Sequence, residues 1–230
     1  MKKFWIAGLA TALMLFQANA VAGLSENEEV AEATAVLTDF VTIPENAIPP
    51  ALLQSAYGIA VIPSVLKVGF ILGGQRGSGV LAVRTESGAW SNPVFVTLTG
   101  GSIGWQIGAS STDLVLVFKS RQSVDEIANG QVTLGGTAAV AAGPVGRSAS
   151  ASTSADLEAE IYSYSRSRGL FAGVAIKGAV LSVNDTANAD FYDKSGVGTY
   201  QILNNADSSD IPKVGQRFVQ LLTHYLPRPR

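Results

Sequence analysis

The feature that most constrains this fold is a succession of short β-type runs between Gly58 and Phe118. β-branched and other apolar residues fill the runs, and Gly, Pro, Asn and Ser punctuate them. This spacing is typical of antiparallel strands joined by tight turns. The runs lie at residues 58–63, 65–72, 79–84, 94–98, 102–107 and 114–118. We therefore predict a β meander whose glycines sit at hairpin turns or at the corners of a curved sheet.

Helical patterns flank this β-rich region. Ser25 and Glu28 have the spacing of a capping box, and Val30, Ala33 and Leu37 recur at helical spacing, which predicts an amphipathic helix over residues 26–41. Residues 21–66 contain six acids and no base, so we expect this helix to pack on its own domain rather than on an anionic bilayer. Further helices are predicted at residues 51–56, 123–129 and 214–225, with Ser123 as a cap of the helix at 123–129, and a short helix or turn is predicted at residues 187–192.

These elements predict an α+β fold. It is a β-rich single domain of mostly antiparallel strands in a barrel- or sandwich-like core, with an N-terminal amphipathic helix and a C-terminal helix. Residues 132–147 are almost all small, so two elements or a ligand must approach their backbone closely. Residues 148–154 are polar and predicted to be a loop.

The stretch Ser163–Val183 joins a basic segment to an apolar one. Tyr164, Arg166 and Arg168 alternate with serines before Gly169, and alternate residues of a strand share one face. This pattern predicts an edge that contacts an anion. The alternative is that the arginines are solvated or paired with carboxylates such as Asp156, Glu158 and Glu160. Residues 170–183 are predicted to form a central strand or strand pair, with Gly173 and Gly178 at a bend or a close contact.

The N-terminus has the pattern of a secretory signal peptide. Lys2 and Lys3 precede an apolar run at residues 4–16 that is too short to span a bilayer, and Ala18-Asn19-Ala20 resembles a cleavage site. We expect residues 1–20 to be removed, with Ala22 as a second choice of cleavage site, and residues 21–230 to form one domain. The chain has no cysteine, and export without disulfides suits a bacterial periplasm with peripheral contact to an envelope membrane.

Charge and residue inventory exclude several classes of function. Loss of the signal leaves 14 basic against 18 acidic residues, which argues against a nucleic-acid partner. His224 is the only histidine, so a zinc site or a cysteine–histidine pair is excluded, and no Gly-x-Ser-x-Gly elbow is present. The carboxylate pairs Glu158 with Glu160 and Asp190 with Asp193 are typical of surfaces. We therefore predict no enzyme, no metal and no cofactor.

Several motifs together resemble the SYLF lipid-binding domain family, which is also labelled an actin-binding domain. They are Tyr57-Gly-Ile-Ala-Val-Ile-Pro63, Lys67-Val-Gly-Phe70, residues 73–81, Gly108, Asp113-Leu-Val-Leu-Val117, Leu134-Gly-Gly136, Ala142-Gly-Pro-Val-Gly-Arg147 and residues 163–173. The resemblance covers residues 30–225. It implies a compact β-rich domain with flanking helices that binds phospholipids, and in eukaryotic members phosphoinositides.

The resemblance and the residues together predict a non-catalytic protein that binds phospholipid or another anionic amphiphile. An exported bacterial member is not expected to bind actin or to select phosphoinositides. The predicted lipid contacts are basic residues and one tyrosine within the matched motifs: Lys67, Arg76, Arg147, Tyr164, Arg166 and Arg168. The alternative is an envelope structural or protein-interaction module, and a hydrolase using His224 is a third.

Overall fold

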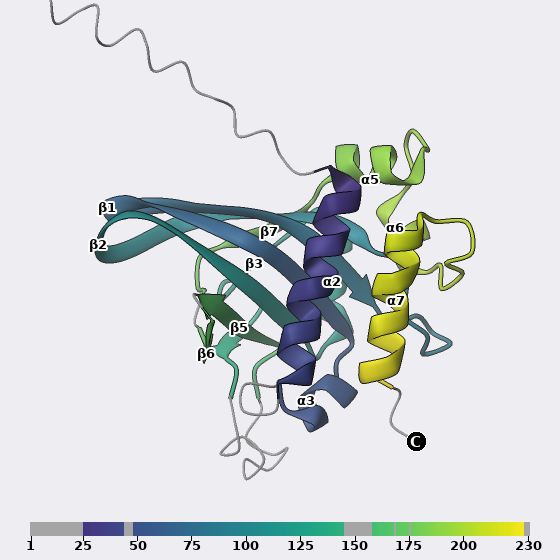
Figure 1. Ribbon diagram of the computed structural model, residues 1–230, viewed down its shortest axis with the longest axis horizontal. Helices are drawn as coiled ribbons and strands as arrows, with labels where there is room; N and C mark the ends of the chain where they lie inside the picture. Colours follow the sequence, from purple (N-terminus) through teal and green to yellow (C-terminus); the bar gives the residue numbers. More distant parts are fainter. Residues whose placement is uncertain (1–24, 44–47, 145–157, 168, 175, 228–230) are drawn as a thin grey trace, which may run out of the picture.

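The computed structural model describes residues 25–43, 48–144, 158–167, 169–174 and 176–227, and the side chains of residues 69–72 and 102–109 are excluded from that description. The predicted signal peptide at residues 1–20 and the predicted loop at residues 148–154 lie outside the described residues. A seven-stranded sheet curls into a half-barrel with an apolar cluster on each of its faces, and two helices lie side by side across one face (Figure 1). The predicted α+β fold, with its mostly antiparallel sheet and its terminal helices, is confirmed.

Two very long strands dominate the sheet. β1 (Gly58–Val83) pairs antiparallel with β2 (Val94–Phe118) along nearly their whole lengths. The prediction of six separate short strands is therefore wrong. Glycine permits a bend in a continuous strand as readily as a chain reversal. Here the glycines lie at bends within β1 and β2. The reversal lies between the strands, where Arg84 bridges Trp90 and Gly88 has a φ of 81°.

The ribbon formed by β1 and β2 folds back on itself. A Cβ on Gly79 would lie 2.1 Å from the carbonyl oxygen of Val61, and one on Gly77 would lie 2.8 Å from the side chains of Ile62 and Val65. The second half of β1 therefore crosses its first half through glycine contacts. The middle of the ribbon points away from α2 and α7 (Figure 1). We call this middle part, residues 66–76 with their partner segment 99–111, the ribbon end.

The remaining strands extend both halves of the ribbon. β5 (Ile161–Ser167) and β7 (Val180–Val183) pair antiparallel with different parts of β2. β3 (Gln131–Thr133) pairs with β7, while β4 (Val140–Ala142) and β6 (Leu170–Gly173) pair with β5. β7 is internal, as predicted for residues 170–183, but β6 lies at an edge. The chain turns between them at Gly178, which has a φ of 81°.

The small residues before β5 permit the predicted close approach. A Cβ on Gly143 would lie 2.1 Å from the ring of Tyr164, and a Cβ on Gly173 would lie 2.0 Å from the carbonyl oxygen of Gly143. The ring of Tyr164 therefore packs directly on the backbone at Gly143, and the backbones at Gly143 and Gly173 approach each other closely. The predicted role of Gly173 in close packing is confirmed.

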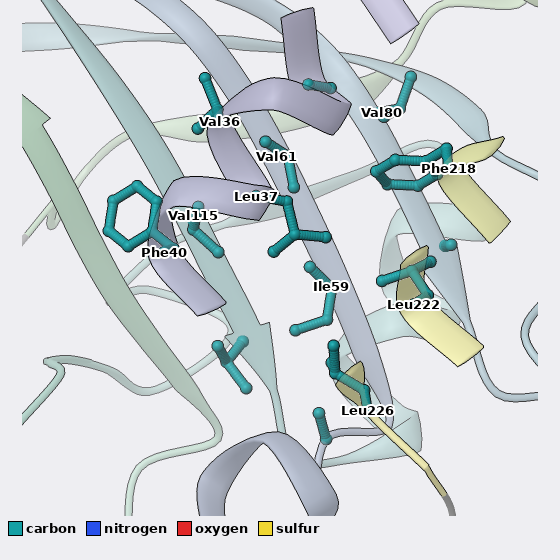
Figure 2. Packing of buried hydrophobic residues seen from close by; sticks show 14 of the residues in the cluster. Val36, Leu37, Phe40, Ile59, Val61, Val80, Val115, Phe218, Leu222 and Leu226 are labelled. Atoms are coloured by element: carbon teal, nitrogen blue, oxygen red, sulfur yellow. The ribbon is translucent and has the colours of Figure 1, made fainter. Parts of the chain in front are cut away.

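Helix α2 (Glu26–Thr42) begins with the predicted capping box. The backbone N–H of Ser25 donates to the carboxylate of Glu28 at 2.9 Å, and these contacts lower the pKa of Glu28. The apolar face of α2 is buried against β1 and against α7 (Lys213–Tyr225). Figure 2 shows Leu37 and Phe40 beside strand residues of this core, with Phe218 of α7 nearby. The prediction that this acidic helix packs on its own domain is confirmed.

The acidic face of α2 carries a locally unfavourable charge. Burial, together with repulsion from Glu26 and Glu32, raises the pKa of Glu29 from 4.5 to about 7. Glu29 is therefore less easily ionised in the folded protein than in the unfolded chain.

The other helices are α3 (Pro50–Gln54), α4 (Arg121–Ala128), α5 (Asp185–Tyr192) and α6 (Thr199–Leu203). α3, α4 and α5 confirm predicted helices, whereas α6 was not predicted. Ser120, not Ser123, caps α4, because the Ser120 hydroxyl accepts from the Ser123 N–H and Ser123 is itself buried inside the helix. Across the described residues, none of the helices has both the length and the apolar character needed to cross a membrane.

Candidate functional site: the root of the ribbon end

Arg166 of β5 is engaged by two carboxylates. Its Nε and Nη2 donate to Oδ2 of Asp113 on β2 at 2.9 and 2.7 Å, and its Nη1 contacts Asp39 of α2. The guanidinium carbon also lies 5.9 Å from the ring centre of Phe171. Desolvation lowers the pKa of Arg166, but the hydrogen bonds and charges of Asp113 and Asp39 outweigh it and raise that pKa. Arg166 therefore ties α2 to the sheet.

The sequence left open the alternative that Arg166 pairs with carboxylates. The structure shows such pairing, but with other carboxylates than those named from the sequence. Glu158 and Glu160 are not those partners, and Asp156 lies outside the described residues. Asp113 lies directly opposite Arg166 across the β2–β5 pair, 53 positions away in the chain. No local spacing indicates such a contact.

Tyr164 lies on the same side of β5 as Arg166, as the alternation predicts, but it belongs to the core. Its side chain is fully buried in the core cluster to which α2 also contributes, and burial raises the pKa of its hydroxyl. Within the described part of the chain, its hydroxyl oxygen has no hydrogen-bond partner. In this arrangement the ring of Tyr164 cannot meet a lipid headgroup at the surface. Arg147 and Arg168 lie outside the described residues, so their roles stay predictions.

Lys67 lines a cleft at the root of the ribbon end. The cleft has a volume of only about 10 Å³, room for about one water molecule, and Lys67 is partly buried there. Its walls combine apolar and polar groups: Val65, Leu114, Val174 and Ile176 with Gln75, Thr112 and Ser165. No carboxylate contributes to this lining, and among the described residues no ion pair involves Lys67. The cleft is thus lined by one basic residue, several neutral polar residues and several apolar residues.

Arg76 follows the cleft residue Gln75 on β1, so its side chain points to the opposite face of the strand from the cleft. Arg76 is exposed and forms no ion pair with any described residue. Leu66 and Val68 flank Lys67 on the other face of β1 and are 45% and 48% exposed. Two predicted contacts, Lys67 and Arg76, therefore lie at the same end of the domain beside exposed apolar side chains.

Sequence reasoning missed Gln75, Thr112 and Ser165. Gln75 and Thr112 lie between the predicted β-type runs, and Ser165 is one of several serines in the basic segment, so none of the three has a distinctive spacing. The fold-back of the ribbon brings Gln75 to Lys67, and pairing with β5 brings Ser165 to the same cleft. Only Gln75 carried a weak signal, as an amide between Gly74 and Arg76.

The side chains with groups suited to catalysis, such as His224 and Glu160, do not line this cleft. His224 is exposed near the end of α7, with its ring edge against Tyr225 at 4.6 Å between centres. Glu160 accepts a hydrogen bond from the N–H of Ala139 at 3.0 Å. Within the described ranges, no three His, Asp or Glu residues are grouped so that they could hold a metal ion.

A curled sheet with a helix-covered face and a small amphiphilic cleft defines a β-rich binding domain. The family model described as "Ysc84: Las17-binding protein actin regulator" matches residues 99–225. The chain therefore belongs to the Ysc84, or SYLF, family, as the sequence motifs indicated. The description of this family is that of a binding domain rather than an enzyme.

Curated relatives extend the match toward the N-terminus. Protein YSC84 of Saccharomyces cerevisiae is 39% identical over 176 residues, which are 73% of this chain and 37% of that protein. An SH3 domain-containing protein of Schizosaccharomyces pombe is 41% identical over 176 residues, or 73% of this chain and 41% of that protein. SH3 domain-containing YSC84-like protein 1 of Xenopus laevis is 36% identical over 181 residues, or 76% and 54% respectively. The chain thus spans about a third to a half of the length of these relatives.

Proposed function

We propose that this protein is a non-catalytic lipid-binding domain of the bacterial envelope, and that it recognises the headgroups of anionic phospholipids at the root of the ribbon end. The observation that carries the proposal is that Lys67 and Arg76 lie at one end of the domain without a described ion-pair partner. Their charges suit phosphate oxygens at the surface, and the exposed Leu66 and Val68 suit the adjoining glycerol and acyl carbons.

Charge supports an anionic ligand at this place. A base near an anionic bilayer contributes about 1 kcal/mol of attraction. Lys67 and Arg76 supply two such charges, and no described carboxylate pairs with either. The whole chain has a net negative charge, which anionic lipids repel. Binding therefore depends on the position of these two bases and not on the total charge.

Vesicle co-sedimentation tests the proposal. The protein should pellet with vesicles that contain phosphatidylglycerol and should remain in solution with pure phosphatidylcholine. Lys67→Ala and Arg76→Ala should each weaken binding about fivefold, which corresponds to about 1 kcal/mol. Arg217→Ala, which removes an exposed charge from α7, is the matched control and should bind as the native protein does. Equal binding of all variants, or equal binding to both kinds of vesicle, would contradict the proposal.

The predicted signal peptide supports the envelope location. Export would place the protein beside envelope membranes, where anionic phospholipids are available. N-terminal sequencing of protein recovered from a periplasmic fraction tests this location. A mature chain that begins at Val21, or at Gly23, supports export, whereas an intact Met1 in the cytoplasmic fraction opposes it.

A protein partner is the second candidate, because the family description names Las17 binding and actin regulation. Pull-down from envelope extracts before and after removal of lipid separates the two functions. A partner that remains bound without lipid, together with absent vesicle binding, would favour the protein-interaction function.

A further inference from the structure

The ribbon end has a composition unlike that of the rest of the chain. Residues 68–75 and 100–109 contain no Asp, Glu, Lys, Arg or His. They do contain several large apolar residues: Phe70, Ile71, Leu72, Ile103, Trp105 and Ile107. Lys67 and Arg76 border the uncharged part of β1 on its two sides. An apolar segment with bases at its border is the pattern of a segment that enters a membrane interface.

The fold-back places this uncharged segment at one extremity of the domain. Gly77 touches Val65, so the chain between them must run outward and return. At 3.3 Å per residue, the six residues to the middle reach at most about 20 Å beyond that contact. In Figure 1 the ribbon end extends away from α2 and α7. A flat surface can therefore touch the ribbon end without touching either helix.

The backbone of the ribbon end limits how deeply it enters a bilayer. β1 and β2 remain paired through it, with one register shift between Gly69 and Ile71, so the groups that face each other are hydrogen-bonded. The outer edge of a ribbon still presents polar backbone groups, which hydrocarbon does not tolerate. The favourable depth is therefore the boundary between headgroups and acyl chains, about 5–10 Å into the bilayer.

Helix α2 does not offer a competing membrane surface. Its apolar residues are buried against β1 and α7, and its first turn carries Glu26, Glu28 and Glu29. Anionic lipids would repel that end of the helix. The ribbon end, with two bases and no acid, is complementary to them in charge.

We propose that the ribbon end is a β-type membrane anchor. Its uncharged segment enters the interface of an anionic bilayer, while Lys67 and Arg76 stay at the headgroup level. This inference rests on the proposed lipid-binding function and adds how the bilayer is engaged. It commits to a lipid bilayer as the occupant of this surface.

The absence of cysteine allows a direct test on the full chain. Gly74→Cys is suitable for an environment-sensitive fluorophore, because Gly74 is exposed and a Cβ there meets no described atom within 4 Å. On vesicles of phosphatidylglycerol and phosphatidylethanolamine, the probe should shift to the blue and be quenched by brominated acyl chains. A probe on Ser195→Cys, which is exposed after α5, should show neither effect.

A charge placed in the anchor provides a second test. Val68→Asp alters a side chain that is already 48% exposed, so the fold should persist. Its binding to these vesicles should fall by more than about tenfold. Native-like binding by this variant would contradict the inference.

The outcomes separate the anchor from lipid binding itself. If the protein pellets with vesicles while the Gly74 probe stays in water, the anchor is wrong and lipid binding stands. If the protein does not pellet with anionic vesicles at all, both proposals fail.

Discussion

Replacing Arg166 should destabilise the protein without removing lipid binding. Arg166→Met keeps the aliphatic stem and deletes the guanidinium that holds Asp113 and Asp39. The side chains of Arg166 and Asp113 are only 21% and 18% exposed, so their separation leaves a poorly solvated carboxylate. Asp39 is 43% exposed and regains water.

The size of this effect follows from those exposures. Hydrogen bonds to charged groups contribute about 1.5–3 kcal/mol each, and the two bonds to one carboxylate oxygen are not additive. We therefore expect the free energy of unfolding to fall by about 2–3 kcal/mol. For a domain of this length, the melting temperature should fall by roughly 5–10 °C.

Urea unfolding followed by circular dichroism measures this loss. The midpoint should fall while the slope stays constant. Arg76→Met is the control, because Arg76 is exposed, and its stability should stay within about 0.5 kcal/mol of the native value. Adding Asp113→Asn to Arg166→Met should restore part of the loss. The reasoning is refuted if Arg166→Met is as stable as the control, or if it unfolds normally yet loses vesicle binding.

Three further predictions concern the fold. Gly79→Ala should lower the free energy of unfolding by about 3 kcal/mol or prevent folding, because the new Cβ would meet the backbone of Val61. Gly74→Ala is the control and should be nearly neutral in thermal unfolding. Equal melting temperatures of the two variants would contradict the fold-back. Tyr164→Phe deletes a buried hydroxyl that has no described hydrogen-bond partner. Its free energy of unfolding in urea should therefore be unchanged or higher by up to about 1 kcal/mol. A loss above about 2 kcal/mol would show that the hydroxyl is hydrogen-bonded. The raised pKa of Glu29 means that the folded state holds its proton more tightly, so the free energy of unfolding should fall as pH rises from about 4.5 to about 7. Glu29→Gln should abolish that fall, which is worth about 3 kcal/mol at most. The same pH profile in the variant and in the native protein would oppose this account.

The sequence predicted the parts of the fold that depend on local signals. The capping box at Ser25 and the helical spacing that follows it define α2 within one residue of its observed end. The long strands could not be predicted in the same way. Gly77 and Gly79 suit a turn as well as a bend, and the contact of Gly79 with Val61 that decides between them joins residues far apart in the chain.

The candidate site was only partly predictable for the same reason. Lys67 and Arg76 were chosen because basic residues in the matched motifs suit phosphate, and they lie together at the ribbon end. Arg166 and Tyr164 were chosen on equal grounds. Their role in holding α2 and the core depends on Asp113 and Gly143, which reach them only through the sheet.

The affinity of a charge-reversed ribbon end for anionic vesicles tests the central claim most directly. Lys67→Glu with Arg76→Glu removes two attractions and adds two repulsions, each of about 1 kcal/mol. The account predicts that this variant melts like the native protein and binds phosphatidylglycerol vesicles at least about 100-fold more weakly in a flotation assay. A folded variant that floats with these vesicles as well as the native protein does would contradict it.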